Sequence, residues 1–187
     1  MEEDNLTIGL LGGTFNPPHV GHLFISCDAI NRFNLDYVWW IITPHNPLKQ
    51  DKPPSVAVRK QWCEELIDNP KIKALDVEKN SKTNCTVDLL RFMIPRYGNN
   101  KYIWIMGLDN LLSFDKWSNW QEVLKTVKIA VYKRPGFEYA IQNKELLKYQ
   151  KPSSEFVITT EPCWSFFDID TPDMSSTIMR ENNERAK

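Results

Sequence analysis

The sequence lacks any apolar run long enough to cross a bilayer. Its longest uninterrupted apolar stretch is residues 37–42, which is far shorter than the ~20 residues of a membrane-spanning helix. Residues 1–5 are acidic and lack the basic and apolar regions of a secretory signal. We therefore expect a cytoplasmic protein with no membrane partner.

Paired cysteines and an excess of one charge are also missing. The four cysteines are scattered without a C-x-x-C pair, which argues against a zinc site and a disulfide framework. Lys and Arg number 23 against 24 Asp and Glu, so the formal net charge is −1, and no basic block stands out. A protein that binds long nucleic acids carries such a block. We therefore expect no nucleic acid polymer as a partner, and any bound nucleotide should be small.

Strand-like and helix-like segments alternate along the chain. Apolar runs typical of strands lie at residues 6–11, 37–43, 72–78, 102–106, 129–132 and 156–159. Segments typical of helices lie at residues 22–33, 56–68, 86–94, 119–126, 138–149 and 176–185. This alternation is typical of βαβ units and predicts an α/β fold with a parallel sheet. The length of 187 residues, with 42% hydrophobic content, suits one domain over residues 1–187.

The most informative segment is GGTFNPPHVGH, residues 12–22, which follows the first apolar run and leads into an expected helix. The paired glycines Gly12 and Gly13 let the backbone approach a ligand closely. The following helix directs free N–H groups and the positive end of its dipole at this loop. The segment therefore predicts a phosphate-binding loop.

Two histidines add chemistry to this loop. His19 and His22 are three residues apart, so in a helix both imidazoles point to the same side. Gly21 leaves room between them for a ligand. The alternative is structural, with one histidine capping the turn and the other packing in an interface. The preceding strand and glycine pair favour the functional interpretation.

A carboxylate follows the fourth strand-like run. Residues 102–106 lead directly into Gly107-Leu108-Asp109, at the edge where open α/β sheets bind ligands. Asp109 either contacts ribose hydroxyls or caps the next helix. Spacing alone leaves both interpretations open.

Hydroxyl groups gather near the C-terminus. Ser175, Ser176 and Thr177 precede Arg180 by one helical turn. Hydroxyls, N–H groups and a guanidinium that converge at a helix start form a cradle for a polyphosphate. An ordinary terminal helix with a serine cap has the same pattern.

Together, these segments resemble the nucleotidyltransferases with an HxGH motif, and more closely the bacterial nicotinate-nucleotide adenylyltransferases. The family pattern GGTFDPxHxGH matches residues 12–22 except at Asn16, and its G-x-D and SSTxxR segments match residues 107–109 and 175–180. The resemblance implies a Rossmann-like, doubly wound, mainly parallel sheet flanked by helices. It also implies transfer of AMP from ATP to nicotinate mononucleotide, giving nicotinate adenine dinucleotide (deamido-NAD) and pyrophosphate in NAD biosynthesis.

The resemblance also assigns the ATP site. The ATP-binding residues would be Gly12, Gly13, Thr14, Phe15, Gly107, Asp109, Ser175, Ser176, Thr177 and Arg180. His19 and His22 would bond the α-phosphate and the bridging oxygen, and Arg180 the departing pyrophosphate. Lys49, in the Pro- and Lys-rich segment 46–54, would add positive charge on closure of this candidate lid, or is an ordinary solvated side chain. Mg²⁺ would arrive with the ATP phosphates, so no protein metal ligand is expected.

Three shorter matches concern the acceptor substrate. They are residues 84–86 (family S-Y-T), 116–117 (K-W) and 133–136 (K-R-P-G). The resemblance places Thr86 and Trp117 around the nicotinate ring, with a backbone N–H at Ser118 receiving its carboxylate and Arg134 in the same subsite. The structural alternatives are Thr86 as an N-cap, Trp117 as core and Arg134 as a solvated strand end. Cys85 and Ser118 stand where the family commonly has aromatic residues.

Other functions stay open at this point. Nicotinamide mononucleotide or phosphopantetheine could be the acceptor in the same chemistry, and a non-catalytic nucleotide-binding module is the alternative from another class. The K-W and K-R-P-G matches favour nicotinate mononucleotide, and two histidines together with SSTxxR favour an enzyme. Seven Trp and nine Phe could fill a core or the interface of a homo-oligomer, and the sequence does not distinguish these.

Overall fold

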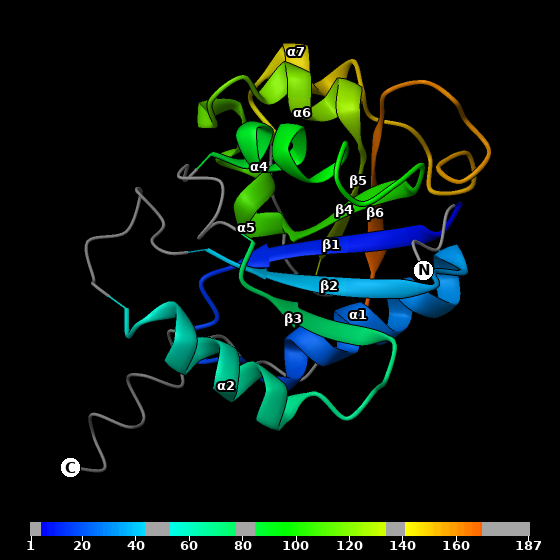
Figure 1. The fold of residues 1–187 in the computed structure, drawn as a ribbon. Coiled ribbons are helices and arrows are strands. Elements are labelled where there is room, and N and C mark those ends of the chain that lie inside the picture. Colours follow the sequence, from blue (N-terminus) through cyan, green and yellow to red (C-terminus); the bar gives the residue numbers. More distant parts are fainter. Residues whose placement is uncertain (1–4, 44–52, 78–84, 134–140, 170–187) are drawn as a thin grey trace.

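The computed structural model describes residues 5–43, 53–77, 85–133 and 141–169. Its strands are β1 Thr7–Gly13, β2 Tyr37–Ile42, β3 Ile72–Leu75, β4 Lys101–Gly107, β5 Lys128–Lys133 and β6 Trp164–Asp168. They form one sheet in the order β3-β2-β1-β4-β5-β6 (Figure 1), and every neighbouring pair is parallel. The predicted α/β fold is confirmed, and this strand order is that of a doubly wound, Rossmann-like sheet.

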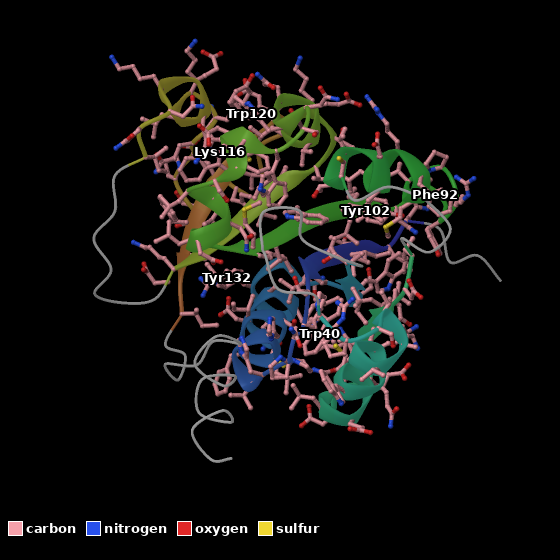
Figure 2. All side chains as sticks on the ribbon, turned by 90° about the vertical axis from the view of Figure 1, so that its left-hand side faces the viewer. Trp40, Phe92, Tyr102, Lys116, Trp120 and Tyr132 are labelled. Carbon is pink, nitrogen blue, oxygen red and sulfur yellow. The ribbon has the colours of Figure 1, made fainter. Side chains whose placement is uncertain are left out.

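Helices cover both faces of the sheet. The helices are α1 Val20–Phe33, α2 Val56–Leu66, α4 Thr86–Met93, α5 Leu108–Leu111, α6 Trp120–Thr126 and α7 Lys144–Leu147, with a 3₁₀ turn η1 at Phe114–Lys116. Helices α1 and α2 lie on one face, and α4 and α6 on the other (Figure 1). Figure 2 shows Trp40 on the side of α1 and α2, and Trp120 on the side of α6. No helix in the described ranges has both the length and the apolar character that crossing a membrane requires.

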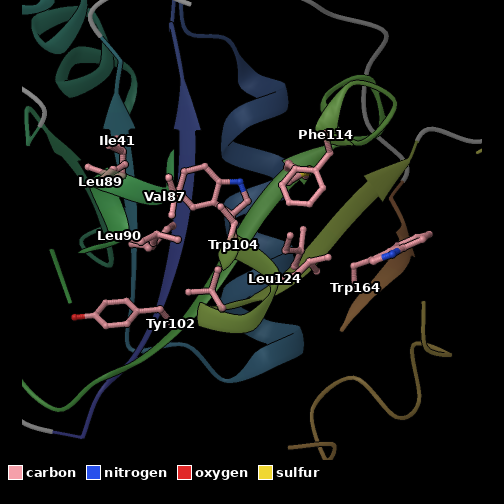
Figure 3. Packing of buried hydrophobic residues seen from close by; sticks show 14 of the residues in the cluster. Ile41, Val87, Leu89, Leu90, Tyr102, Trp104, Phe114, Leu124 and Trp164 are labelled. Carbon is pink, nitrogen blue, oxygen red and sulfur yellow. The ribbon is translucent and has the colours of Figure 1, made fainter. Parts of the chain in front are cut away.

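Two hydrophobic cores result from this layering. Successive side chains of a strand point to opposite faces, so Leu10 and Trp104 pack against α4 and α6, while Leu11 and Ile105 pack against α1 and α2. Figure 3 shows the first core, with Trp104 among side chains from α4 and α6. Because both faces are covered, a central strand such as β2 reads as a continuous apolar run.

The strand order places a ligand site at one edge of the sheet. The chain leaves β1 toward β2 on one side and later returns to β4 on the other side of β1. Open α/β sheets bind ligands in the crevice outside the carboxyl ends of the strands at such a switch point. Strand β1 ends at Gly13 and β4 ends at Gly107. The two glycine-containing segments that the sequence singles out therefore lie at this edge.

One predicted strand is wrong. Residues 153–158 form turns rather than a strand, and Phe156 is fully buried whereas Ile158 is 77% exposed. Only Phe156 of this apolar run is buried in the core. The side chains therefore do not alternate between two faces as those of a strand do. The sheet ends instead with β6, which pairs with β5 from Trp164 to Asp168. Ser165 interrupts the short apolar run of β6, which explains why the pattern does not predict it.

The remaining boundaries follow local chemistry. The other predicted strands agree with β1, β2, β4 and β5 to within two residues at each end, whereas β3 ends at Leu75. Of the predicted helix 138–149, residues 138–140 lie outside the described residues, and α7 begins only at Lys144 because the Asn143 side chain accepts hydrogen bonds from the Glu145 and Leu146 N–H groups and caps it. The predicted helix 176–185 lies outside the described residues. Helix α5 and the turn η1 are not predicted by the pattern.

Candidate active site

The phosphate loop begins where β1 meets a tryptophan from the neighbouring strand. A Cβ added to Gly12 would lie 2.7 Å from Cζ2 and Cη2 of Trp104. Real Cβ atoms do not approach other atoms so closely, and Trp104 is buried in the core. Gly12 is therefore required because the Trp104 ring occupies the space of a side chain.

The loop then turns back through Phe15. This residue has a φ of 47°, in the left-handed region that is costly for a bulky side chain. Its ring is buried and stacks on Trp40 at a centroid distance of 5.0 Å and an angle of 14°. It also lies 4.8 Å from the His22 ring. Packing of Phe15 holds the loop in a strained turn, as is common at functional sites.

The two histidines form the start of α1. His19 is the N-cap residue, in an extended conformation, and α1 begins at Val20. The His19 N–H donates to His22 Nδ1 at 3.1 Å, and the His22 N–H donates to the His19 carbonyl at 2.9 Å. The ring centroids are 3.8 Å apart. The predicted HxGH pair is thus brought together at a helix N-terminus, where it caps the helix and faces the loop.

His22 is held as a neutral imidazole. Burial, with a further contribution from His19, lowers the pKa of His22 from 6.5 to about 3. Because Nδ1 accepts a backbone N–H, the single ring proton lies on Nε2. His22 therefore offers a fixed N–H donor that does not titrate near neutral pH.

This pKa shift makes the stability of the fold depend on pH. An unfolded chain protonates His22 below 6.5, whereas the folded chain does so only near 3, so folding stability falls as the pH falls between these values. Between pH 7 and pH 5, the free energy of unfolding of the native protein should fall by on the order of 1–2 kcal/mol more than that of His22→Gln. Urea unfolding of both proteins at these pH values measures it. An identical pH slope in the variant would contradict the shift.

The third predicted segment lies next to the loop. Gly107 ends β4 and is the N-cap of α5, so Asp109 lies in the first turn of α5 and does not cap it. A Cβ on Gly107 would lie 2.5 Å from Asp109 Oδ1. The carboxylate therefore folds back over the end of β4. Strand β4 pairs with β1, so this end lies beside the strand that leads into the phosphate loop.

Trp117, one of the residues predicted to bind the acceptor substrate, is connected to the loop through Trp104. Trp117 lies edge-on to Trp104 at a centroid distance of 6.4 Å and an angle of 89°, and Trp104 contacts Gly12. Trp117 is half-buried and Ser118, which follows it, is exposed. Thr86 is the first residue of α4 and its N-cap is Cys85, so Thr86 is not the cap.

Several predicted site residues lie outside the described residues. They are Lys49, Arg134, Ser175, Ser176, Thr177 and Arg180. Two others are not predicted by the sequence. Trp104 contacts the loop, and Arg59 of α2 donates to the loop carbonyl of Thr14. In the described ranges, no group of three or more His, Cys, Asp or Glu side chains is placed to hold a metal ion.

Known proteins resemble this chain over nearly its whole length. A family model described as cytidylyltransferase-like matches residues 10–182. A protein of Ruegeria sp. (strain TM1040), named probable nicotinate-nucleotide adenylyltransferase, is 34% identical over 183 residues, which cover 94% of this chain and 97% of the relative. A protein of Agrobacterium fabrum with the same name is 34% identical over 187 residues, covering 96% of this chain and 100% of the relative.

A solved structure shares the fold. It is the nicotinic acid mononucleotide adenylyltransferase of Plasmodium falciparum, complexed with NaAD. The two chains superpose with a TM-score of 0.73 at 19% sequence identity, over 95% of this chain and 83% of the other. At this identity the likeness concerns the arrangement of strands and helices.

Proposed function

Since the chain belongs to the cytidylyltransferase-like family and, within it, to the nicotinate-nucleotide adenylyltransferases, we propose that the site at the carboxyl ends of β1 and β4 transfers AMP from ATP to nicotinate mononucleotide. The products are nicotinate adenine dinucleotide and pyrophosphate, so the enzyme is a nucleotidyltransferase of NAD biosynthesis. The observation that carries the site assignment is the pair His19 and His22 at the N-terminus of α1.

The reaction needs positioning more than a strong base. A phosphate oxygen of nicotinate mononucleotide attacks the α-phosphorus of ATP, and the bond from that phosphorus to the bridging oxygen breaks as pyrophosphate leaves with the electron pair. The attacking phosphate is already anionic, because its second pKa is about 6. The protein therefore contributes by aligning two anions and stabilising charge on the transferred phosphate.

His22 and the start of α1 supply that stabilisation. The Nε2–H of His22 donates to the α-phosphate, and a neutral imidazole does so without a proton transfer. His19, the cap residue, bonds the bridging oxygen beside it. Free N–H groups of the first turn of α1 complete the anion site. Because both rings belong to one helix end, they are aligned before ATP binds.

The rest of the ATP site follows the family pattern. We assign Gly12, Gly13, Thr14 and Phe15 to the phosphates, and Gly107 with Asp109 to the ribose. Residues Ser175, Ser176, Thr177 and Arg180 would hold the β- and γ-phosphates, and Lys49 would add charge beside them. All of these residues belong to one nucleotidyltransferase domain over residues 1–187.

Magnesium suits this set of donors only as a partner of the substrate. The described site offers imidazoles and backbone N–H groups, which bond phosphate oxygens, and a single carboxylate, Asp109, which we assign to the ribose, whereas Mg²⁺ prefers several oxygen ligands and keeps several waters. Bound through the triphosphate, Mg²⁺ would neutralise phosphate charge. The protein residues then orient the complex.

The acceptor subsite lies around Trp117. Its half-buried ring offers a face on which a pyridine ring stacks, and its edge contact with Trp104 connects this face to the loop. We assign Thr86 and the backbone N–H of the exposed residue Ser118 to the nicotinate carboxylate, and Arg134 to the same substrate. A backbone N–H is kept whatever the side chain, so Ser118 serves in place of an aromatic residue.

Isotope exchange tests the function. Incubation of the enzyme with labelled pyrophosphate and nicotinate adenine dinucleotide should form labelled ATP by the reverse reaction. NAD and dephospho-coenzyme A, the products of the alternative acceptors, should exchange much more slowly. A protein that binds these nucleotides but forms no labelled ATP from any of them would be a binding module.

Arg180 provides a test of the C-terminal cradle. We expect Arg180→Ala to raise the KM for ATP, and for pyrophosphate in the reverse reaction, by about 10-fold or more, because a charge-assisted contact to an anion of about 1.5–3 kcal/mol is lost. The KM for nicotinate mononucleotide should change little. Steady-state kinetics in both directions measure the effect. Unchanged ATP kinetics would make residues 175–180 an ordinary terminal helix.

A further inference from the structure

An arginine is buried completely beside the phosphate loop. Arg59 lies in α2, and none of its surface is exposed to solvent. A charged side chain is almost never fully buried unless its donors are bonded, because removal of the charge from water is costly. The position of Arg59 therefore reflects specific bonds.

Those bonds go to three separate backbone segments. Nη1 of Arg59 donates to the Thr43 carbonyl at 2.8 Å and also to the Thr14 carbonyl, and Nε donates to the Pro54 carbonyl at 2.8 Å. Thr14 belongs to the phosphate loop, Thr43 follows β2 and Pro54 precedes α2. One guanidinium therefore ties the loop after β1 to the end of β2 and to the start of α2.

The loop is held at two consecutive carbonyls. The Thr43 N–H donates to the Gly13 carbonyl at 3.0 Å, and Arg59 holds the next carbonyl, that of Thr14. Thr43 is itself bonded to Arg59. The backbone that turns from β1 toward His19 is thus fixed from outside the loop by one connected set of bonds.

We propose that Arg59 is a positioning residue for adenylyl transfer, which sets the phosphate loop at the distance from the histidine pair that the α-phosphate requires. This proposal rests on the proposed function. The planar guanidinium has donors in a fixed fork, which lets it reach carbonyls from different segments at once. Its permanent positive charge also favours anions on this side of the site.

The kinetic effect should fall on turnover. A displacement of about 1 Å in a reacting group costs about 10²-fold in rate, so Arg59→Gln should lower kcat by about 10- to 100-fold. The KM for nicotinate mononucleotide, which binds at Trp117, should change by less than about threefold. Arg59→Lys keeps the charge without the fork, and it should recover part of kcat.

A matched control separates positioning from loss of helix stability. Cys63 is fully buried one turn further along α2, so Cys63→Ala weakens the packing of the same helix but leaves the Arg59 side chain and its carbonyl partners in place. Its melting temperature should fall, while kcat stays within about twofold of the native value. All variants are assayed at a temperature at which circular dichroism shows that each is folded.

A second readout does not depend on catalysis. Hydrogen–deuterium exchange of the amides in residues 12–16 should be faster in Arg59→Gln and Arg59→Lys than in the native protein, and unchanged in Cys63→Ala. Native kcat in Arg59→Gln, or an equal loss of kcat in Cys63→Ala, would overturn the proposal. If Arg59→Gln does not fold, Arg59→Lys carries the same two tests. If the native protein forms no dinucleotide, the proposed function fails, and unchanged loop exchange would reject the Arg59 assignment separately.

Discussion

Replacement of His22 by alanine should lower the turnover number by about 10²–10³-fold, because a hydrogen-bond donor to the transition state is removed. The neutral ring of His22 presents a fixed Nε2–H, since its Nδ1 accepts the His19 N–H. That donor is in place before ATP binds, so its effect falls mainly on the chemical step. Binding of ATP, which we also assign to the loop and to residues 175–180, should be mostly retained. Steady-state kinetics with ATP varied measure both parameters.

Two further variants make this prediction sharper. His22→Gln keeps an amide N–H near the same position and should retain more activity than His22→Ala. Phe24 lies in the same helix and is 46% exposed, so Phe24→Ala should leave kcat unchanged. The alanine variant also leaves the His19 N–H without its acceptor, a cap loss of about 1 kcal/mol that thermal unfolding detects. Near-native turnover in His22→Ala would remove His22 from the chemistry.

Replacement of Gly12 by alanine should lower turnover by about 10²-fold and stability by about 1–3 kcal/mol. The added Cβ would lie 2.7 Å from two ring atoms of Trp104. Trp104 is 3% exposed and is packed edge-on against Trp117, so the ring cannot move aside freely. The loop must shift instead. The ATP phosphates that we assign to this loop then move away from the histidines. Urea unfolding and kcat measurements test the two effects.

A double variant tests the cause of this loss. Trp104→Phe removes the ring atoms that the new Cβ would meet, so Gly12→Ala combined with Trp104→Phe should recover much of the activity lost in Gly12→Ala alone. Gly13→Ala is a milder change, because its nearest contact would be Phe15 at 3.2 Å. Full activity of Gly12→Ala would show that the loop tolerates the side chain and that its position does not limit turnover.

Most of the fold could be predicted because a doubly covered parallel sheet leaves a clear pattern. Strands such as β2 and β4 are buried on both faces, so their sequences are continuous apolar runs. The pattern fails where burial is local. Phe156 is a single buried anchor in a turn, and β6 contains Ser165, whose hydroxyl donates to the Lys151 carbonyl at 2.8 Å and is buried without being apolar.

The site could be predicted only where its residues are neighbours in sequence. Residues 12–22 carry the strand end, the loop and both histidines in one segment, so spacing predicted that the two histidines come together beside the loop. Trp104 and Arg59 contact the loop across the fold, and Arg59 lies 45 residues from the loop carbonyl to which it donates. An arginine among the other charged residues of α2 carries no local sign of burial. Such contacts depend on how α2 packs, which spacing does not encode.

The most direct measurement compares kcat/KM for nicotinate mononucleotide and nicotinamide mononucleotide, with ATP and Mg²⁺ and chromatographic identification of the dinucleotide. The two acceptors differ only in a carboxylate and a carboxamide on the pyridine ring, so the comparison tests the subsite at Trp117 and Ser118. We expect nicotinate mononucleotide to be preferred by at least about 10-fold, or about 1.4 kcal/mol, with nicotinate adenine dinucleotide and pyrophosphate as products. Preference for the amide would contradict the acceptor assignment, and no dinucleotide from either acceptor would contradict adenylyl transfer itself.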